Sequence, residues 1–295
     1  MQRWPMDLRT LEAIVRGLAT HIPRPRKSGG STALPRYCYT VWGRHLITLR
    51  KMGCTLTDAK VLELGPGHSL GSSLCALFTL AREAHGLDLF AVRQPGAENR
   101  MLPELSAMFQ RREDLPGRNE FPKAKPYLED LALPDGEPIR NVDRADLESR
   151  LRYHVEEIHT FGDDGSFDLI FSQATLQHIE DVEGYFRAFA RLLTRGGWMS
   201  HQIDFSCFET AKRWNGHWLY PGPLWRVMRG NYCLTNRRPL SHYLELGDRF
   251  GFRLVGTLPT LDRTGYPYEA RRAWCQDFTQ ADFETSGAML VWQKE

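Results

Sequence analysis

The chain has 295 residues, of which 42% are hydrophobic and 25% are charged, and its formal net charge is +2. This composition is typical of a globular protein that can bury a sizeable core without disulfides or metals. So weak a charge excludes a strongly basic nucleic-acid or membrane-surface protein, and no stretch approaches the roughly 20 apolar residues that a membrane span needs. We therefore expect neither nucleic-acid nor membrane partners.

The six cysteines are widely spaced and include no C-x-x-C pair. This spacing argues against a zinc site and fits reduced thiols. The first 23 residues lack the uninterrupted apolar core of a secretory signal. We therefore predict a cytoplasmic protein without a metal site.

From residue 60 onward, apolar runs alternate with helical patterns, which predicts a mostly parallel sheet with helices on both faces. The expected strands are 61–64, 85–89, 151–156, 167–172, 198–203, 252–257 and 288–293. The expected helices are 69–82, 101–112, 144–152 and 181–194, the last of which is broken by Gly196 and Gly197.

Three regions depart from this alternation. Residues 1–59 are expected to form an N-terminal helical lid or cap, ahead of a main domain that spans 60–295. Residues 93–150 separate the second and third strands and hold seven of the 17 prolines, so we predict a folded insertion there. Residues 205–245 are dense in aromatic side chains, and we expect them to lie on the substrate side.

The stretch KVLELGPGHSLG, residues 60–71, predicts a buried strand that runs into a glycine turn. Gly65 and Gly67 allow backbone angles and close approaches that a Cβ would block. A dinucleotide fingerprint would need a third glycine at position 70, which is Leu70, and the turn lacks the ending of a phosphate loop. Glu63 precedes the turn and favours a ligand that carries an amino group or a positive charge.

The second strand ends near Asp88, in AHGLDLF. In an open α/β sheet, an acid at this place holds the two ribose hydroxyls of a bound nucleotide. The alternative is a solvated loop aspartate. With Glu63, this residue predicts a nucleoside ligand that carries a positive charge.

These stretches, with GSFDLIFSQATLQHI and LLTRGGWM, resemble the class I S-adenosylmethionine-dependent methyltransferases from about residue 60 to 205. The resemblance implies a Rossmann-like sheet of seven strands whose last strand is antiparallel. It also implies S-adenosyl-L-methionine as cofactor, with Glu63 near the methionine amino group, Gly65 and Gly67 along the backbone, and Asp88 on the ribose. Ser69 stands where the family often has a third glycine. The further cofactor positions are Glu156 at the adenine, and Ser172 and Gln173 at the methionine portion.

The acceptor side is less defined. The stretch RYCYTVWGRHL, residues 36–46, has two interpretations. It forms either a lid or an amphipathic helix that packs on the sheet edge. WNGHW and TNRRPLSHY supply further polar and aromatic groups. The expected substrate-binding residues are Tyr39, Trp42, Arg44, Asn215, His217, Trp218 and Arg237.

An oxygen nucleophile loses a proton during methyl transfer, so a base within reach would assist. The candidates are His178, His201 and Asp204. His201 has a core role as its alternative, and His178 has helix-start packing. We expect O-methylation of a small polar metabolite or sugar-like molecule. The alternatives are N-methylation of a small molecule and a non-catalytic S-adenosylmethionine-binding regulatory or partner protein.

Overall fold

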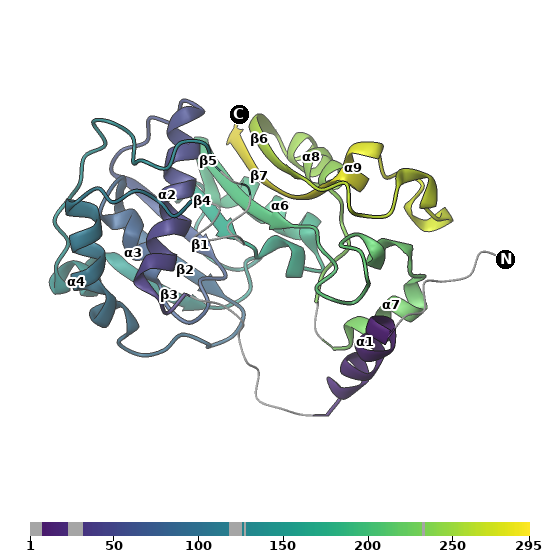
Figure 1. Ribbon diagram of the computed structural model, residues 1–295. Coiled ribbons are helices and arrows are strands. Elements are labelled where there is room, and N and C mark those ends of the chain that lie inside the picture. Colours follow the sequence, from purple (N-terminus) through teal and green to yellow (C-terminus); the bar gives the residue numbers. More distant parts are fainter. Residues whose placement is uncertain (1–7, 23–31, 118–125, 127, 232–233) are drawn as a thin grey trace.

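The computed structural model describes residues 8–22, 32–117, 126, 128–231 and 234–295 (Figure 1). The strands of its sheet are β1 (Ala59–Leu64), β2 (Ala81–Asp88), β3 (Leu151–Val155), β4 (Phe167–Gln173), β5 (Leu193–Asp204), β6 (Phe252–Leu261) and β7 (Thr285–Lys294). Their order is β3-β2-β1-β4-β5-β7-β6. The strands β1 to β5 are parallel, whereas β7 is antiparallel to β5 and β6. The predicted fold class, including its antiparallel last strand, is confirmed.

Helices cover both faces of this sheet (Figure 1). The helices of the described chain are α1 (Leu8–Ala19), α2 (Pro35–Lys51), α3 (Gly71–Leu77), α4 (Ala97–Gln110), α5 (Arg144–Arg150), α6 (Val182–Leu192), α7 (Gly222–Arg229), α8 (Leu240–Arg249) and α9 (Gln280–Glu284). Short 3-10 turns are η1 (Leu176–His178), η2 (Gly216–Leu219), η3 (Tyr268–Ala270) and η4 (Ala273–Cys275). No helix in the described part of the chain is long and apolar enough to cross a membrane.

The two faces of the sheet bury separate cores. In β4, Leu169 and Phe171 join the core under α2 and α3, whereas Ile170 joins the core under α6 and α8. Successive side chains of a strand point to opposite faces, and a parallel sheet is covered on both. The strands are therefore apolar on both sides, which is why FDLIFS was readable as a buried strand.

Several predicted boundaries are wrong, and two of them lie where a helix gives way to a strand. The helix expected over 69–82 ends at Leu77, and β2 already begins at Ala81, next to the hydrogen bond from Ala59 N to Leu80 O at 2.9 Å. The apolar run 74–81 suits a buried helix and a buried strand equally, so periodicity did not separate them. Likewise, β5 begins at Leu193, before the glycine pair expected to precede it.

The described parts of the predicted N-terminal cap occupy two places. The helix α2 packs into the core beside α3, with Tyr39 and Trp42 fully buried. The helix α1 packs instead on α7, where Ala13 joins a small separate cluster. Residues 1–7 and 23–31 lie outside the described residues. The division at residue 59 therefore stays a prediction.

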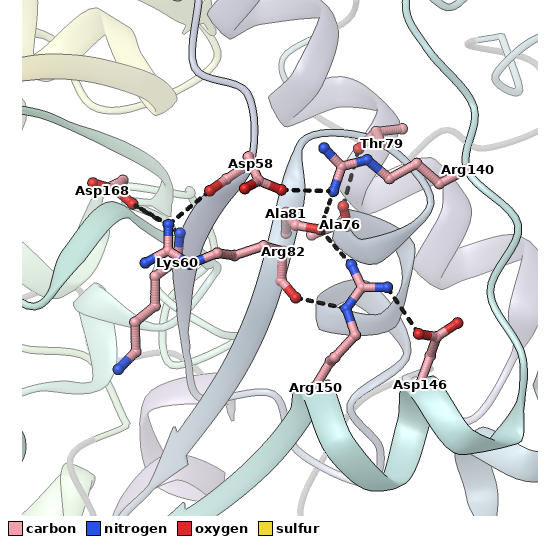
Figure 2. Close-up of polar contacts among 10 residues, drawn as sticks. All are labelled: Asp58, Lys60, Ala76, Thr79, Ala81, Arg82, Arg140, Asp146, Arg150 and Asp168. Carbon is pink, nitrogen blue, oxygen red and sulfur yellow. Dashed lines mark hydrogen bonds and ion pairs between the residues drawn. The ribbon is translucent and has the colours of Figure 1, made fainter.

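The insertion over 93–150 returns to the body of the protein at the amino end of β2, as Figure 2 shows. Arg140 Nη1 donates to the Ala81 carbonyl at 3.0 Å. Arg150 donates to the same carbonyl at 3.1 Å and to the Arg82 carbonyl at 2.6 Å. Residues 118–125 and 127 lie outside the described residues. The described part that leads into β3 is thus tied to the sheet.

Candidate active site

Polar side chains meet at the carboxyl edge of β1, β2 and β4. Glu63 is the penultimate residue of β1, Asp88 ends β2 and Gln173 ends β4. The ladder sets Glu63 level with Gly86 of β2 and with Phe171 of β4. The chain reverses its direction of winding between β1 and β4, and open α/β sheets bind ligands at such a switch point.

The glycine turn between β1 and α3 has the geometry that glycine permits. The φ angles of Gly65 and Gly67 are +65° and +74°, in the left-handed region that L side chains rarely adopt. A Cβ on Gly65 would lie 2.7 Å from Thr175 Cγ2. Thr175 itself donates a hydrogen bond to the Leu64 carbonyl at 3.1 Å. Glycine is therefore required at position 65 for both its backbone angle and its space.

Side-chain oxygens accept hydrogen bonds from the backbone of this turn. Gly67 N donates to Asp88 Oδ2 at 3.2 Å, and His68 N donates to Thr32 Oγ1 at 2.9 Å. Leu70 N donates to Glu98 Oε1 at 2.7 Å. Two of these three acceptors are carboxylates, so the turn is an acidic cradle. It repels a pyrophosphate and suits a cationic ligand.

Burial makes the two predicted cofactor acids hard to ionise. Only 3% of Glu63 is exposed, and its Oε2 accepts a hydrogen bond from Ser73 Oγ at 2.5 Å. Burial raises the pKa of Glu63 to about 7, with a further contribution from Asp88. Burial likewise raises the pKa of Asp88 to about 6. A positively charged or hydrogen-bond-donating ligand would favour the ionised form of both.

The other predicted cofactor residues differ in position. Ser69 is buried in the turn, and its hydroxyl donates to the Thr32 carbonyl. Glu156 lies exposed one residue past β3, and its N–H donates to the Asp88 carbonyl at 3.1 Å. Ser172 is fully buried and bonds to His201 Nδ1 at 2.8 Å, so it faces the core under α6. Gln173 is half-buried and donates to Gln202 Oε1 at 2.9 Å.

The three candidate bases lie in different environments. His201 is fully buried against the Phe189 ring, and burial lowers its pKa to about 3. Asp204 ends β5 and accepts a hydrogen bond from Ser206 N at 2.8 Å. His178 is exposed on η1, and its Nδ1 lies 2.7 Å from the Leu234 carbonyl. Of the two histidines, only His178 is accessible to a substrate.

Most of the predicted substrate-binding side chains lie in the interior. Tyr39 donates to the Glu113 carbonyl at 2.5 Å, and Trp42 donates to Thr79 Oγ1 at 3.0 Å. Their positions support the packing interpretation of 36–46 and not the lid. Arg44 is also buried, with Nη2 2.6 Å from the Pro126 carbonyl.

In the aromatic-rich region, Asn215 is buried and clamps the backbone of Tyr266 through two hydrogen bonds, of 2.9 and 2.6 Å. His217 and Trp218 are buried beside each other, and burial lowers the pKa of His217 well below its ordinary value. Arg237 is half-buried, with its guanidinium 5.3 Å from the centre of the Trp225 ring. Residues 232–233 of this region lie outside the described residues.

The sequence analysis did not predict four residues that contact the glycine turn or Asp88. Thr32 and Thr175 lie against Gly67 and Gly65. Glu98 reaches the turn from α4, which begins at Ala97, whereas the helix expected there begins at Met101. Tyr153 Oη lies 3.4 Å from Asp88 Oδ2. Each contact joins segments far apart in the chain, so no local pattern could predict it. In the described ranges, no three or more His, Cys, Asp or Glu side chains form a group that could hold a metal ion.

Comparison with known proteins adds a family. A family model described as "Methyltransferase domain" matches residues 38–257. No curated protein matches the sequence significantly. Among solved structures, the chain is similar to an S-adenosylmethionine-dependent methyltransferase from Mesorhizobium loti, with 16% identity, a TM-score of 0.44, and coverage of 84% of this chain and 96% of that one. It is also similar to geranyl diphosphate methyltransferase in complex with SAM, with 10% identity, a TM-score of 0.48, and coverage of 86% and 85%.

Proposed function

The chain belongs to the methyltransferase domain family, and from that membership we propose that it methylates an oxygen atom of a small polar molecule with S-adenosylmethionine as the methyl donor. The glycine turn and the acids beside it are the observation that supports the cofactor site. Gly65 and Gly67 take positive φ angles in the turn, and Glu63 and Asp88 are desolvated acids beside it. These two acceptors fit the N–H donors of an ammonium group and the hydroxyls of a ribose.

The residues have distinct roles in this proposal. Glu63 would hold the amino group of the cofactor, and Asp88 would hold its ribose hydroxyls. Among the described residues, Gly67 N and Tyr153 Oη both contact Oδ2 of the Asp88 carboxylate, so Oδ1 is the oxygen that would face the ribose. Glu156 would meet the adenine amine from the end of β3. The bound cofactor supplies a methyl carbon on a sulfonium, and the protein aligns the acceptor with it and excludes water.

His178 is the base that we propose for an oxygen acceptor. A carbonyl can only accept a hydrogen bond, so the 2.7 Å contact with the Leu234 carbonyl places the proton on Nδ1. In the neutral ring, Nε2 then keeps its lone pair. A Gln177 amide nitrogen 3.5 Å from Nε2 is consistent with that tautomer. His178 could therefore take a proton at Nε2 while Leu234 holds the ring.

Arg237 supports a polar or acidic acceptor. Nη1 donates to the carbonyls of Tyr220 at 2.7 Å and His217 at 3.2 Å. Among the described residues, no carboxylate forms an ion pair with Arg237. Asn236, the residue before Arg237, donates its backbone N–H to the Gln177 carbonyl at 2.7 Å, and Gln177 is the residue before His178. Arg237 thus belongs to the same side of the sheet edge as His178.

A small amine is the second acceptor class, because an ammonium group must also lose a proton before it attacks. The net charge of +2 does not favour a nucleic-acid substrate. A cytoplasmic location stays the prediction made from the sequence.

The test is a screen of hydroxyl-bearing and amine-bearing metabolites for release of S-adenosylhomocysteine, with the methylated atom identified by NMR of the product. For an oxygen acceptor, H178A should lower kcat by about 100-fold or more. H159A is the control, since His159 is likewise an exposed histidine and lies 3.7 Å from Asp181. Full turnover by H178A would overturn the base assignment, and an N-methylated product would overturn the oxygen acceptor.

A further inference from the structure

Glu98 is a buried carboxylate of the insertion, and its side chain contacts the glycine turn. Only 3% of its side chain is exposed, and Oε1 accepts the Leu70 N–H at 2.7 Å. Leu70 immediately precedes α3, so this contact ties down the far end of the turn. A second hydrogen bond joins the insertion to the same turn, since Gln94 N donates to the His68 carbonyl at 2.8 Å.

Arg93 holds Glu98 in place. Its Nε and Nη2 donate to the two carboxylate oxygens at 3.1 and 2.8 Å, a bidentate pair. Burial raises the pKa of Glu98, but the hydrogen bonds from Arg93 and from Leu70 N outweigh it, and the net pKa is below its ordinary value. Glu98 is therefore a permanent anion at the turn.

The same guanidinium also reaches the opposite end of the turn. Its carbon lies 5.7 Å from the centre of the Tyr153 ring, close enough for cation–π attraction. Tyr153 Oη lies 3.4 Å from Asp88 Oδ2, which in turn accepts Gly67 N at 3.2 Å. The contacts thus form a closed ring from Gly67 N, through Asp88, Tyr153, Arg93 and Glu98, to Leu70 N.

We propose that Arg93 and Glu98 are positioning residues for the cofactor, through which the insertion sets the shape of the glycine turn and the orientation of Asp88. Neither side chain needs to touch the cofactor. The insertion can carry this role because its other described end is fixed to β2 through Arg140 and Arg150 (Figure 2). The proposal rests on the cofactor assignment above and not on the identity of the acceptor.

The experiment is calorimetric titration of the full-length protein with S-adenosylhomocysteine, for wild type, E98Q and E137Q. Glu137 is the matched control. It also lies in the insertion, its side chain is also 3% exposed, and it also forms a bidentate pair, with Arg50 at 2.7 and 2.8 Å. Both variants should lower the urea midpoint of unfolding. E98Q alone should raise the Kd, by about fivefold to tenfold, while E137Q should change it less than twofold.

A milder variant and a double-mutant cycle separate positioning from general loss of stability. Arg93 is 32% exposed, so R93K is expected to fold even where E98Q does not, and it should weaken binding in the same direction. R93K combined with D88N should show a non-additive effect on the Kd, because both act through Asp88. E137Q combined with D88N should be additive.

Three results are decisive. Wild type that does not bind S-adenosylhomocysteine overturns the cofactor assignment, and this proposal with it. If wild type binds while E98Q and R93K bind equally well, the positioning role alone is wrong. An equal loss of affinity in E98Q and E137Q would also overturn it, since both losses would then reflect stability.

Discussion

Glu63 makes cofactor binding dependent on pH. Its pKa is about 7 in the free protein, and an ammonium group on the ligand favours the ionised carboxylate. Binding below pH 7 must therefore release a proton. We expect the Kd of S-adenosylhomocysteine to rise by up to about tenfold for each pH unit below 7, with a shallower slope in E63Q. Calorimetry at pH 6, 7 and 8 measures this, and a flat profile would contradict it.

The same carboxyl group should destabilise the free protein when it ionises. Its folded-state pKa lies above the ordinary value of 4.5, so the folded state binds more protons than the unfolded state between about pH 4.5 and 7. Stability therefore falls as the pH rises through this window. At pH 8, E63Q should unfold at a urea concentration equal to or above that of wild type, while it binds the cofactor more weakly.

Asp88 tests the ribose assignment. A hydrogen bond to a charged group contributes about 1.5–3 kcal/mol, so D88A should raise the Kd of S-adenosylhomocysteine by about tenfold or more. The Asp88 side chain is partly exposed, and its carboxylate contacts Gly67 N and Tyr153 Oη in the described part of the chain, so this variant should fold. Wild-type affinity in D88A would remove Asp88 from the cofactor site.

At the scale of elements, Asp282 joins α8 to α9. The residue is 1% exposed, and its carboxylate accepts four hydrogen bonds, from the N–H and hydroxyl of Ser241 and of Thr279. D282A removes all four of these hydrogen bonds and should cost about 2–4 kcal/mol of unfolding free energy, measured with urea. D277A, at an exposed position just before α9, should stay within about 0.5 kcal/mol of wild type.

The type of an element was predictable where the spacing of its apolar residues and the length of the segment both indicated the same type. The helix expected over 181–194 is α6, which Asp181 caps by accepting Gly184 N at 2.9 Å. The stretch 69–82 was harder, since a continuous apolar run fits a buried strand and a buried helix alike. Pairing of Lys60 with Glu83 and its neighbours draws that part of the chain into β2, and such pairing is not a local property.

At the scale of the molecule, α1 is held apart from the two main cores by its contact with α7. A Cβ on Gly17 would lie 1.9 Å from the Val227 carbonyl oxygen, so G17L should undock α1 from α7. Trypsin should then cleave at Arg16 at least about tenfold faster, because local opening controls proteolysis. The main unfolding transition should move little, since Ala13 and Met228 belong to the separate cluster.

The control for that prediction places the same side chain on the solvent side of α1. E12L adds a leucine where Glu12 is exposed, and it should leave the cleavage rate unchanged. If G17L is cleaved no faster than E12L, the contact with α7 does not hold α1.

The sequence by itself determined the fold class, the methyltransferase resemblance, the glycine turn and the acids at the ends of β1 and β2. These depend on local features: alternation of apolar runs, glycine where φ is positive, and carboxyl ends that meet at one edge. The fold class is confirmed by the strand order, and the resemblance by the family match over residues 38–257.

Only the tertiary structure decided which side chains stand at the site and which belong to the core. Both faces of a parallel sheet are covered, so strand alternation could not tell whether His201 or Ser172 faced a ligand or a helix. It also could not pair Glu98 with Leu70, or Tyr153 with Asp88. Those contacts join residues 28 and 65 positions apart, and the packing of the insertion against the sheet brings them together.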